Sequence, residues 1–379
     1  MSVFDRVIDR RATISSKWEK YAGQDVIPMW VADMDFAAPQ PVLQAIQERL
    51  AHPVLGYNAR PLPTIDVIQH WLSSHYQWSV DAEAILLSPG VVPALNQAVR
   101  AFVRPGRAVA VAVPTYPPFL QAPLNMSRDV QRLTMTAAND WMFPIDQLKA
   151  ALSGDHNIDL LMLSHPMNPV GKVLDRPMLE EIARVCEQAN VVICSDEIHC
   201  DLLLDARRHT PLASISAEAA ARTVTFQAAS KTFNLAGLGC AYAVIENPTL
   251  RETFEQAGAG IMAHVNTLGF VATQAALSEC ESWRLELLDY LAENRDRVCE
   301  VVERLAGLSI QRPEATYLAW IDVRELALDN PHDFFAEYGL GIAAGEEYEG
   351  PGYIRLNFGC PRSTLEEGLA RLVRAVDSL

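Results

Sequence analysis

"TVTFQAASKTFNLAGL", residues 223–238, joins two features that rarely occur together. The stretch opens with an apolar run of strand-forming residues, and Lys231 follows shortly after that run ends. Lysine is almost never fully buried in a protein unless it is paired. The apolar surroundings of Lys231 therefore predict a lysine with a particular partner or chemical task.

Similar apolar runs recur along the chain and alternate with segments that carry apolar residues at helical spacing, such as residues 176–189. This alternation predicts an α/β fold with a mostly parallel sheet that helices cover on both faces. In such sheets the ligand site lies beyond the carboxyl ends of the strands. The further runs are "AILLS" (84–88), "AVAVAVP" (108–114), "IDLLMLS" (158–164), "VVICSD" (191–196) and "GCAYAVI" (239–245).

The second half of the chain has a different character. Residues 282–306 predict one long amphipathic helix that could bridge two domains. Shorter strand candidates follow at 316–323 and 352–359, and a terminal helix begins near residue 363. We therefore expect an N-terminal arm (1–40) that contributes to a small domain, a large domain (41–283) and a small α+β domain (284–379).

The composition excludes several classes of protein. The chain of 379 residues has 47 acidic residues against 31 Lys and Arg, a net charge of −16, so nucleic-acid binding is not expected. The N-terminus lacks the apolar core of a signal peptide, and the apolar runs are too short to span a bilayer. Seven scattered cysteines, without a CxxC pair or a metal-ligand spacing, predict reduced thiols in a cytoplasmic protein that binds no metal.

Polar residues follow several of the predicted strands. Gly90 opens a turn into a helix, whose N-terminus could bind an anion, although many such turns only reverse the chain. Asn168 lies between prolines and has an ordinary turn residue as its alternative. Asp196 ends a buried strand and needs either a cationic partner or a helix N-terminus to cap. His199, taken alone, indicates a structural residue.

The predicted sheet brings Gly90, Asn168, Asp196 and Lys231 to a common edge. An anion cradle, a hydrogen-bond donor, a carboxylate and a partly desolvated lysine are together what pyridoxal phosphate requires. The combination, and no single member of it, predicts this cofactor.

The motifs also resemble a known family. The order of "SPG", "NPVG", "SDE", "SKTFNLAGL" and "RLNFGCPRS" is similar to that of fold-type I, aspartate-aminotransferase-like pyridoxal phosphate enzymes. The stretches "IDRRATISSKWEKY", "PMWVADMDFAAP", "GYN", "SPGVVPAL", "SDEIHCDL" and "RLNFGCPRS" resemble the MalY/PatB type of cystathionine β-lyase. The resemblance spans nearly the whole chain. It implies the fold-type I architecture, in which the large domain binds the cofactor, and a homodimer.

The resemblance also implies roles for individual residues. Lys231 would form the Schiff base with the cofactor, Asp196 would pair with the ring nitrogen, and Asn168 would bind the ring 3-hydroxyl with His199 nearby. The other implied cofactor contacts are Tyr116 against the ring face, Gly90, Val91 and Ser230 around the phosphate, and Tyr57 reaching the phosphate from the second subunit.

Arg355, in the predicted strand "YIRLNFG", would bind the α-carboxylate of the substrate. Without the resemblance, a surface ion pair is the alternative at this position. One position departs from the wider superfamily, whose aminotransferases usually carry a phosphate-binding arginine where this chain has Gly239. That difference favours the lyase branch.

The implied reaction is β-elimination from L-cystathionine or a related cysteine S-conjugate, which yields a thiol such as homocysteine, pyruvate and ammonia. Lys231 would act as the general base, and Asp196 would keep the cofactor ring protonated. A class I/II aminotransferase shares the early steps and is the first alternative. A non-catalytic regulatory protein on the same fold is the second.

Overall fold

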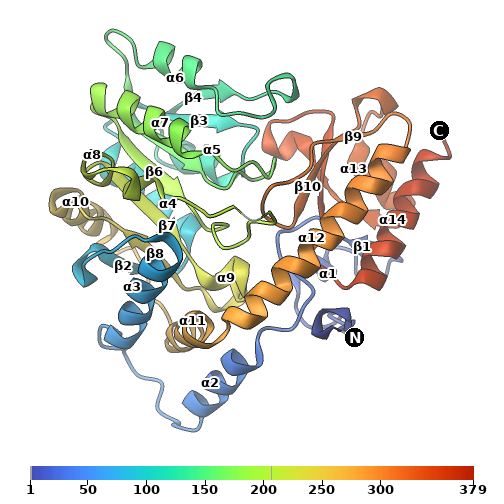
Figure 1. Cartoon of the computed structure of the whole chain (residues 1–379), viewed down its shortest axis with the longest axis horizontal. Coiled ribbons are helices and arrows are strands. Elements are labelled where there is room, and N and C mark those ends of the chain that lie inside the picture. Colours follow the sequence, from blue (N-terminus) through green and yellow to red (C-terminus); the bar gives the residue numbers. More distant parts are fainter. Residues whose placement is uncertain (1, 206) are drawn as a thin grey trace.

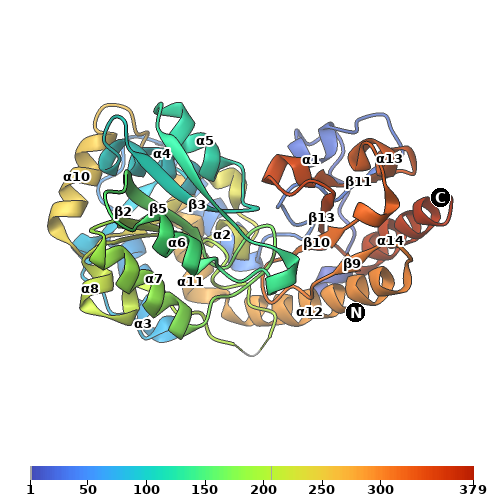
Figure 2. The ribbon, with the colours of Figure 1, turned by 90° about the horizontal axis from the view of Figure 1, so that it is seen from above.

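The computed structural model describes residues 2–205 and 207–379. The chain forms a large lobe around a seven-stranded sheet and a smaller lobe around a four-stranded sheet (Figures 1 and 2). The N-terminal segment packs with the smaller lobe, beside the C-terminal helix and strands (Figure 2). The site described below depends on this return of the N-terminus to the end of the chain.

The seven-stranded sheet confirms the predicted mostly parallel arrangement. Its order is β2-β8-β7-β6-β5-β3-β4, and all its strands are parallel except β8, which runs antiparallel to both neighbours. In this spatial order the strands are β2 (Ile85–Ser88), β8 (Ala241–Val244), β7 (Thr223–Gln227), β6 (Val192–Asp196), β5 (Ile158–Ser164), β3 (Ala108–Val113) and β4 (Asp129–Thr134).

Alternate side chains of these strands enter two different hydrophobic cores. In β3, for example, Ala110 packs in the core beneath α6 and α7, whereas Val111 packs in the core beneath α4, α5 and α10. Helices thus cover both faces, as predicted. The large-lobe helices are α2 (Gln40–Leu50), α3 (Leu62–Tyr76), α4 (Val91–Phe102), α5 (Pro118–Asn125), α6 (Ile145–Ala151), α7 (Arg176–Gln188), α8 (Ala217–Ala220), α9 (Ala229–Thr232), α10 (Pro248–Gly258) and α11 (Thr267–Glu279).

The long helix α12 (Glu281–Arg304) runs from the large lobe along the smaller one, close to the predicted bounds (Figure 2). The smaller lobe has an antiparallel sheet in the order β12-β13-β10-β9 and a parallel pair, β1 with β11. The expected domain boundaries after residues 40 and 283 stay predictions. The elements of this lobe are α1 (Ser16–Glu19), β1 (Ile27–Pro28), β9 (Ser309–Ile310), β10 (Leu318–Asp322), α13 (Pro331–Glu337), β11 (Leu340–Gly341), β12 (Ala343–Ala344), β13 (Tyr353–Asn357) and α14 (Arg362–Val376).

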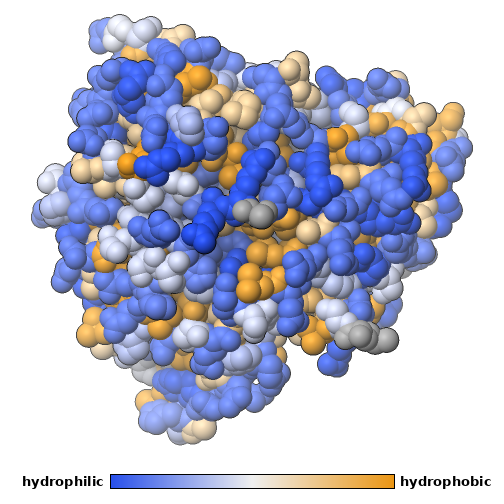
Figure 3. All heavy atoms as spheres, viewed as in Figure 1, coloured by the Kyte–Doolittle hydropathy of each residue, from blue (hydrophilic) through white to orange (hydrophobic). Residues whose placement is uncertain are grey.

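The surface is mostly hydrophilic on the face seen in Figure 3, where hydrophobic residues occur in small separate groups. None of the helices in the described residues is both long and apolar enough to cross a membrane. All seven cysteines are buried free thiols.

Candidate active site

The register of the large sheet brings three of the predicted residues together. Ser164, the last residue of β5, pairs with Asp196 of β6, and Asp196 pairs with Phe226 of β7. The three strands therefore end at one level, so the loop with Asn168, the carboxylate of Asp196 and helix α9 with Lys231 lie at the same edge. The predicted gathering at the strand ends is thus confirmed for these positions.

Lys231 is half-buried and its Nζ donates a 2.6 Å hydrogen bond to the carbonyl oxygen of Ala32. Burial lowers the pKa of Lys231 to about 8, and the positive charge of Arg355 lowers it too. The carboxylates of Asp33 and Asp196 act in the opposite direction. A lysine amine with such a pKa is partly neutral near physiological pH, so it can act as a nucleophile or base.

Asp196 is 5% exposed, and its Oδ1 accepts a 3.1 Å hydrogen bond from the backbone N–H of Ile198. No helix begins in the turn that follows β6, so Asp196 does not cap a helix. Burial raises the pKa of Asp196 to about 7, although the Ile198 N–H and the charge of Lys231 lower it. A cation placed beside a carboxylate whose pKa is raised by burial stabilises its ionised form.

Arg355 is 3% exposed and lies in β13, so the alternative of a surface ion pair is wrong. Its Nη1 donates to Oδ1 of Asn168 at 2.8 Å, and its Nη2 donates to the carbonyl oxygen of Trp30 at 2.9 Å. The guanidinium also lies 4.4 Å from the ring centroid of Tyr348. Within residues 2–205 and 207–379, no carboxylate lies within ion-pair distance of Arg355. A buried guanidinium without a carboxylate partner is suited to bind an anionic ligand.

His199 and Tyr116 lie in the same neighbourhood. His199 is buried, its ring meets that of Tyr317 edge-on at 6.1 Å, and its Nδ1 has no partner among the described residues. Burial lowers the pKa of His199 to about 3, and Lys231 and Arg355 lower it too, so this imidazole is neutral. Burial also raises the pKa of Tyr116. The negative charge of Asp196 raises this pKa too, whereas the positive charge of Arg355 lowers it.

The start of α4 forms the predicted turn from strand to helix. Gly90 precedes the helix and Val91 is its first residue, and no side chain caps its first N–H groups. Ser230 lies on α9, directly before Lys231. Gly239 has a left-handed φ of +54°, and a Cβ there would lie 3.0 Å from the carbonyl oxygen of Pro89. Any larger residue at position 239 would be strained and would press on this turn.

Tyr57 is the one predicted residue that the structure does not bring to the site. It lies in the loop between α2 and α3 with its side chain fully exposed.

Sequence reasoning missed the contribution of the N-terminal arm. The carbonyl groups of Trp30 and Ala32 accept the hydrogen bonds of Arg355 and Lys231. The hydroxyl of Tyr317 also donates to Ala32, at 3.2 Å. A signal was present in "PMWVADMDF", because two carboxylates in an apolar stretch require partners.

Comparisons with known proteins show which family the chain resembles over its full length. Cystathionine beta-lyase PatB of Bacillus subtilis (strain 168) is 35% identical, over 98% of this chain and 99% of that protein. The crystal structure of OvoB has a TM-score of 0.96 and 40% identity, and the match covers 99% of both chains. That of cystalysin from Treponema denticola, which contains pyridoxal 5′-phosphate, has a TM-score of 0.95 and 31% identity, covering 99% of this chain and 98% of that chain. The family model described as aminotransferase class I and II matches residues 24–372, and the chain therefore belongs to that family.

Proposed function

We propose that this protein is a pyridoxal-phosphate-dependent β-lyase that cleaves the carbon–sulfur bond of L-cystathionine or a related cysteine S-conjugate. The observation that carries the proposal is that Lys231 and Asp196 lie near Arg355, which has no carboxylate partner among the described residues. The name of the PatB relative and the cofactor in the cystalysin structure support it.

The residues present fit this cofactor. Asp196 is a buried carboxylate that a protonated ring nitrogen would stabilise. The Nδ1 atom of His199 and the Nε atom of Arg355 are buried without a partner in the described part of the chain. Buried polar atoms of this kind are usually satisfied, so a polar ligand explains them. When bound, the cofactor supplies an electron sink for the negative charge that develops at the substrate Cα.

Individual residues then take the following tasks. Lys231 would attach the cofactor through its amine, and Asp196 would pair with the ring nitrogen. Asn168 would donate from its amide nitrogen to the ring 3-hydroxyl, because its Oδ1 already accepts from Arg355. The remaining proposed contacts are His199 beside Asn168, Tyr116 on the ring face, and Gly90, Val91 and Ser230 around the phosphate.

During the reaction, the substrate amine would displace the amine of Lys231 from the cofactor, and the freed amine of Lys231 would then remove the proton from the substrate Cα. Its hydrogen bond to Ala32 uses an N–H and leaves the lone pair of the neutral amine for that proton. Arg355 binds and orients the α-carboxylate. The thiolate leaves Cβ with the electrons of the C–S bond, and hydrolysis of the remaining three-carbon fragment yields pyruvate and ammonia.

An aminotransferase is the alternative that the family itself suggests. Gly239 favours the lyase, since a phosphate-binding arginine at that position would need a strained backbone and would crowd Pro89. One assay separates the two functions. The holoenzyme is incubated with cystathionine and, separately, with an amino acid and a keto acid. Release of pyruvate and free thiol supports the lyase, and formation of a new amino acid supports the aminotransferase. If no product forms in either incubation, the regulatory alternative is supported.

The functional unit that we propose is a homodimer. A cavity of about 1330 Å³ opens between the loop containing Tyr57 and residues 258–270. Val54, Leu55 and Ile261 are exposed nearby, and a second copy of the chain would cover them. We also place the protein in the cytoplasm, where seven free thiols would stay reduced.

Complementation tests the dimer. Mixing refolded Tyr57→Ala and Lys231→Ala chains should restore activity that neither has alone, because one site in each mixed dimer then holds both native residues. Inactive mixed dimers would contradict the proposed role of Tyr57.

A further inference from the structure

Residues 30–36, which we call the arm segment, cross the site between the two lobes. The carbonyl of Trp30 accepts from Arg355, and the carbonyl of Ala32 accepts from Lys231. The position of this segment therefore determines where the amine of Lys231 lies relative to the proposed carboxylate-binding arginine.

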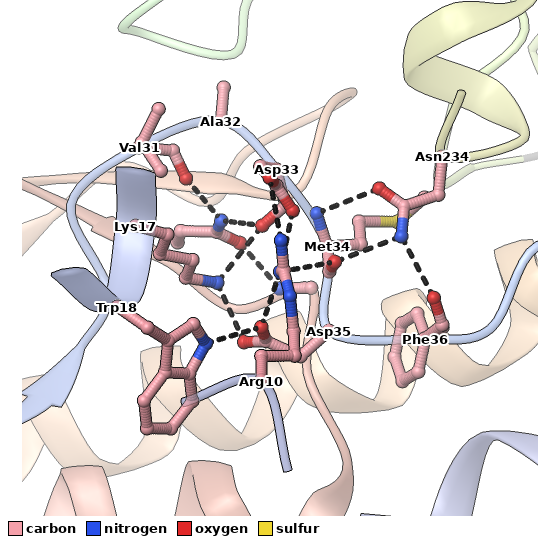
Figure 4. A network of polar contacts seen from close by, with 12 residues as sticks. Arg10, Lys17, Trp18, Val31, Ala32, Asp33, Met34, Asp35, Phe36 and Asn234 are labelled. Atoms are coloured by element: carbon pink, nitrogen blue, oxygen red, sulfur yellow. Dashed lines mark hydrogen bonds and ion pairs between the residues drawn. The ribbon is translucent and has the colours of Figure 1, made fainter. Parts of the chain in front are cut away.

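Two carboxylates of the arm segment, Asp33 and Asp35, bind two cations from the preceding chain, Arg10 and Lys17. We call these four charged residues the arm cluster. Arg10 reaches between the two carboxylates, with Nη1 at 2.7 Å from Oδ1 of Asp33 and 2.7 Å from Oδ1 of Asp35 (Figure 4). Its Nη2 donates to Oδ2 of Asp33 at 2.9 Å. Lys17, with only 1% of its side chain exposed, donates to Oδ2 of Asp35 at 2.7 Å and to the carbonyl of Asp33 at 2.9 Å.

The helix that carries Lys231 leads into a second anchor of the same segment. Asn234 donates from Nδ2 to the carbonyls of Met34 and Phe36, at 2.9 and 2.8 Å, and accepts from the N–H of Met34 (Figure 4). Arg10 donates to the carbonyl of Met34 as well, at 3.1 Å. The arm cluster and the Lys231 region therefore hold one piece of backbone from two sides.

The pair of Lys17 with Asp35 is buried, and the pairs of Arg10 are partly buried. Such ion pairs add little net stability, since the cost of desolvation offsets most of the attraction. They do fix geometry, because each charge requires its partner at a set position. The arm cluster contains two cations and two anions, so its net charge is zero. Asp33 is the member whose charge acts on Lys231.

We propose that the arm cluster is a positioning device for Lys231, which holds the carbonyl of Ala32 against the lysine amine and keeps the adjacent Asp33 charge neutralised by Arg10. The inference rests on the proposed function, in which Lys231 is the base. Arg10, Lys17, Asp33 and Asp35 are positioning residues in this scheme.

The scheme predicts opposite effects for the two members of one ion pair. The charged and titratable groups that act on or face Lys231 are Arg355, Asp33, Asp196, His199 and Tyr317. Arg10→Gln leaves the Asp33 charge uncompensated, which favours the protonated lysine nitrogen. Asp33→Asn removes that charge and leaves Arg10 uncompensated, which disfavours the protonated nitrogen of Lys231.

The experiment measures two pH titrations on each variant loaded with pyridoxal phosphate. One follows the visible absorbance, which changes when the nitrogen of Lys231 loses its proton, and the other follows kcat/KM. We expect Arg10→Gln to move both midpoints to higher pH and Asp33→Asn to move both to lower pH, each by about half a pH unit or more. Arg10→Lys restores the charge and should bring the absorbance midpoint back toward that of the wild type.

Arg295→Gln is the matched control. Arg295 is a buried arginine of α12 that pairs with Asp205 and Asp296 and lies outside the arm cluster. It should lower the melting temperature without moving either midpoint. Unshifted midpoints in both arm variants, or shifts of the same sign, would overturn the proposal. Asp33→Asn keeps the test decisive if Arg10→Gln fails to fold, since Asp33 is 27% exposed and the new side chain has the same shape. Lyase activity retained by Lys231→Ala would instead refute the proposed function.

Discussion

Nη1 of Arg355 donates a 2.8 Å hydrogen bond to Oδ1 of Asn168, although 187 positions separate them in the chain. Arg355 belongs to β13 of the smaller lobe, and Asn168 follows β5 of the large lobe. The contact joins the proposed carboxylate-binding residue to the residue proposed to hold the cofactor ring. Guanidinium has five N–H donors in a fixed plane, so others remain for a carboxylate.

Arg355→Ala is expected to lower kcat/KM for cystathionine by several hundred-fold or more, since losing a desolvated charge partner costs on the order of 2–5 kcal/mol. Cofactor occupancy, read from the visible absorbance, should be unchanged. Arg355→Lys should recover only part of the rate, because an ammonium lacks the planar fork. Arg324→Ala, which removes an exposed arginine paired with Asp322, is the control and should have little effect. Normal cleavage by Arg355→Ala would mean that the carboxylate binds elsewhere.

The contact between Arg355 and Asn168 should also appear as an energetic coupling. In a double-mutant cycle of Arg355→Ala and Asn168→Ala, we expect the effects on kcat/KM to be non-additive by about 0.5–3 kcal/mol. Steady-state kinetics of the two single variants and the double variant measure this term. Strictly additive effects would show that the two residues act independently.

Lys231→Ala should abolish both the visible absorbance of the bound cofactor and β-elimination, because one amine serves as attachment point and base. Absorbance spectra and pyruvate release measure the two losses. Lys149→Ala, which breaks a surface pair with Glu181, is the control and should retain both signals. A Lys231→Ala protein that still releases pyruvate would contradict the assignment.

Asp196→Ala should keep part of the cofactor yet lose about 10²–10³-fold or more in kcat, the loss typical when a group that stabilises developing charge is removed. Cofactor content and kcat are measured on the same preparation, so that loss of binding is not mistaken for loss of rate. A variant with nearly the wild-type rate would reduce Asp196 to a structural residue.

The raised pKa of Asp196 also predicts how the stability of the cofactor-free protein depends on pH. Burial places this pKa at about 7 in the folded chain, against the usual 3.8. At pH values between these two, the folded state therefore binds a proton that the unfolded state has lost. Stability therefore falls as the pH rises from about 4 to about 7. Asp196→Asn should be more stable than the wild type above pH 7, by up to about 4 kcal/mol, and equal to it near pH 4.

Urea unfolding of both apoproteins at pH 5 and pH 8 measures this difference. The m-values should agree between the two proteins, so that the comparison reflects stability alone. If the stability difference between Asp196→Asn and the wild type grew toward low pH, it would have the wrong sign. That result would contradict a carboxylate at position 196 whose pKa is raised by burial.

The local sequence pattern was sufficient to predict the alternating strands and helices of the fold. The apolar runs that became β2, β3, β5, β6, β7 and β8, and the long helix α12, lie close to their predicted bounds. Continuous apolar runs and helical spacing are short-range signals, so they survive without knowledge of the partners. The strand β4 was missed because most of its residues, such as Asp129 and Gln131, are polar and exposed, as suits a sheet edge.

The sequence by itself also determined that Lys231, Asp196 and Asn168 follow buried strands, because in a parallel sheet such positions meet at one edge. Only the tertiary structure decided the antiparallel direction of β8, the close approach of Gly239 to Pro89, and the return of the arm segment to Lys231. Each of these depends on contacts between segments far apart in the chain, whose geometry is set by packing and not by local periodicity. The hydrogen bond between Arg355 and Asn168 exists for the same reason, since it forms only once the two lobes have packed.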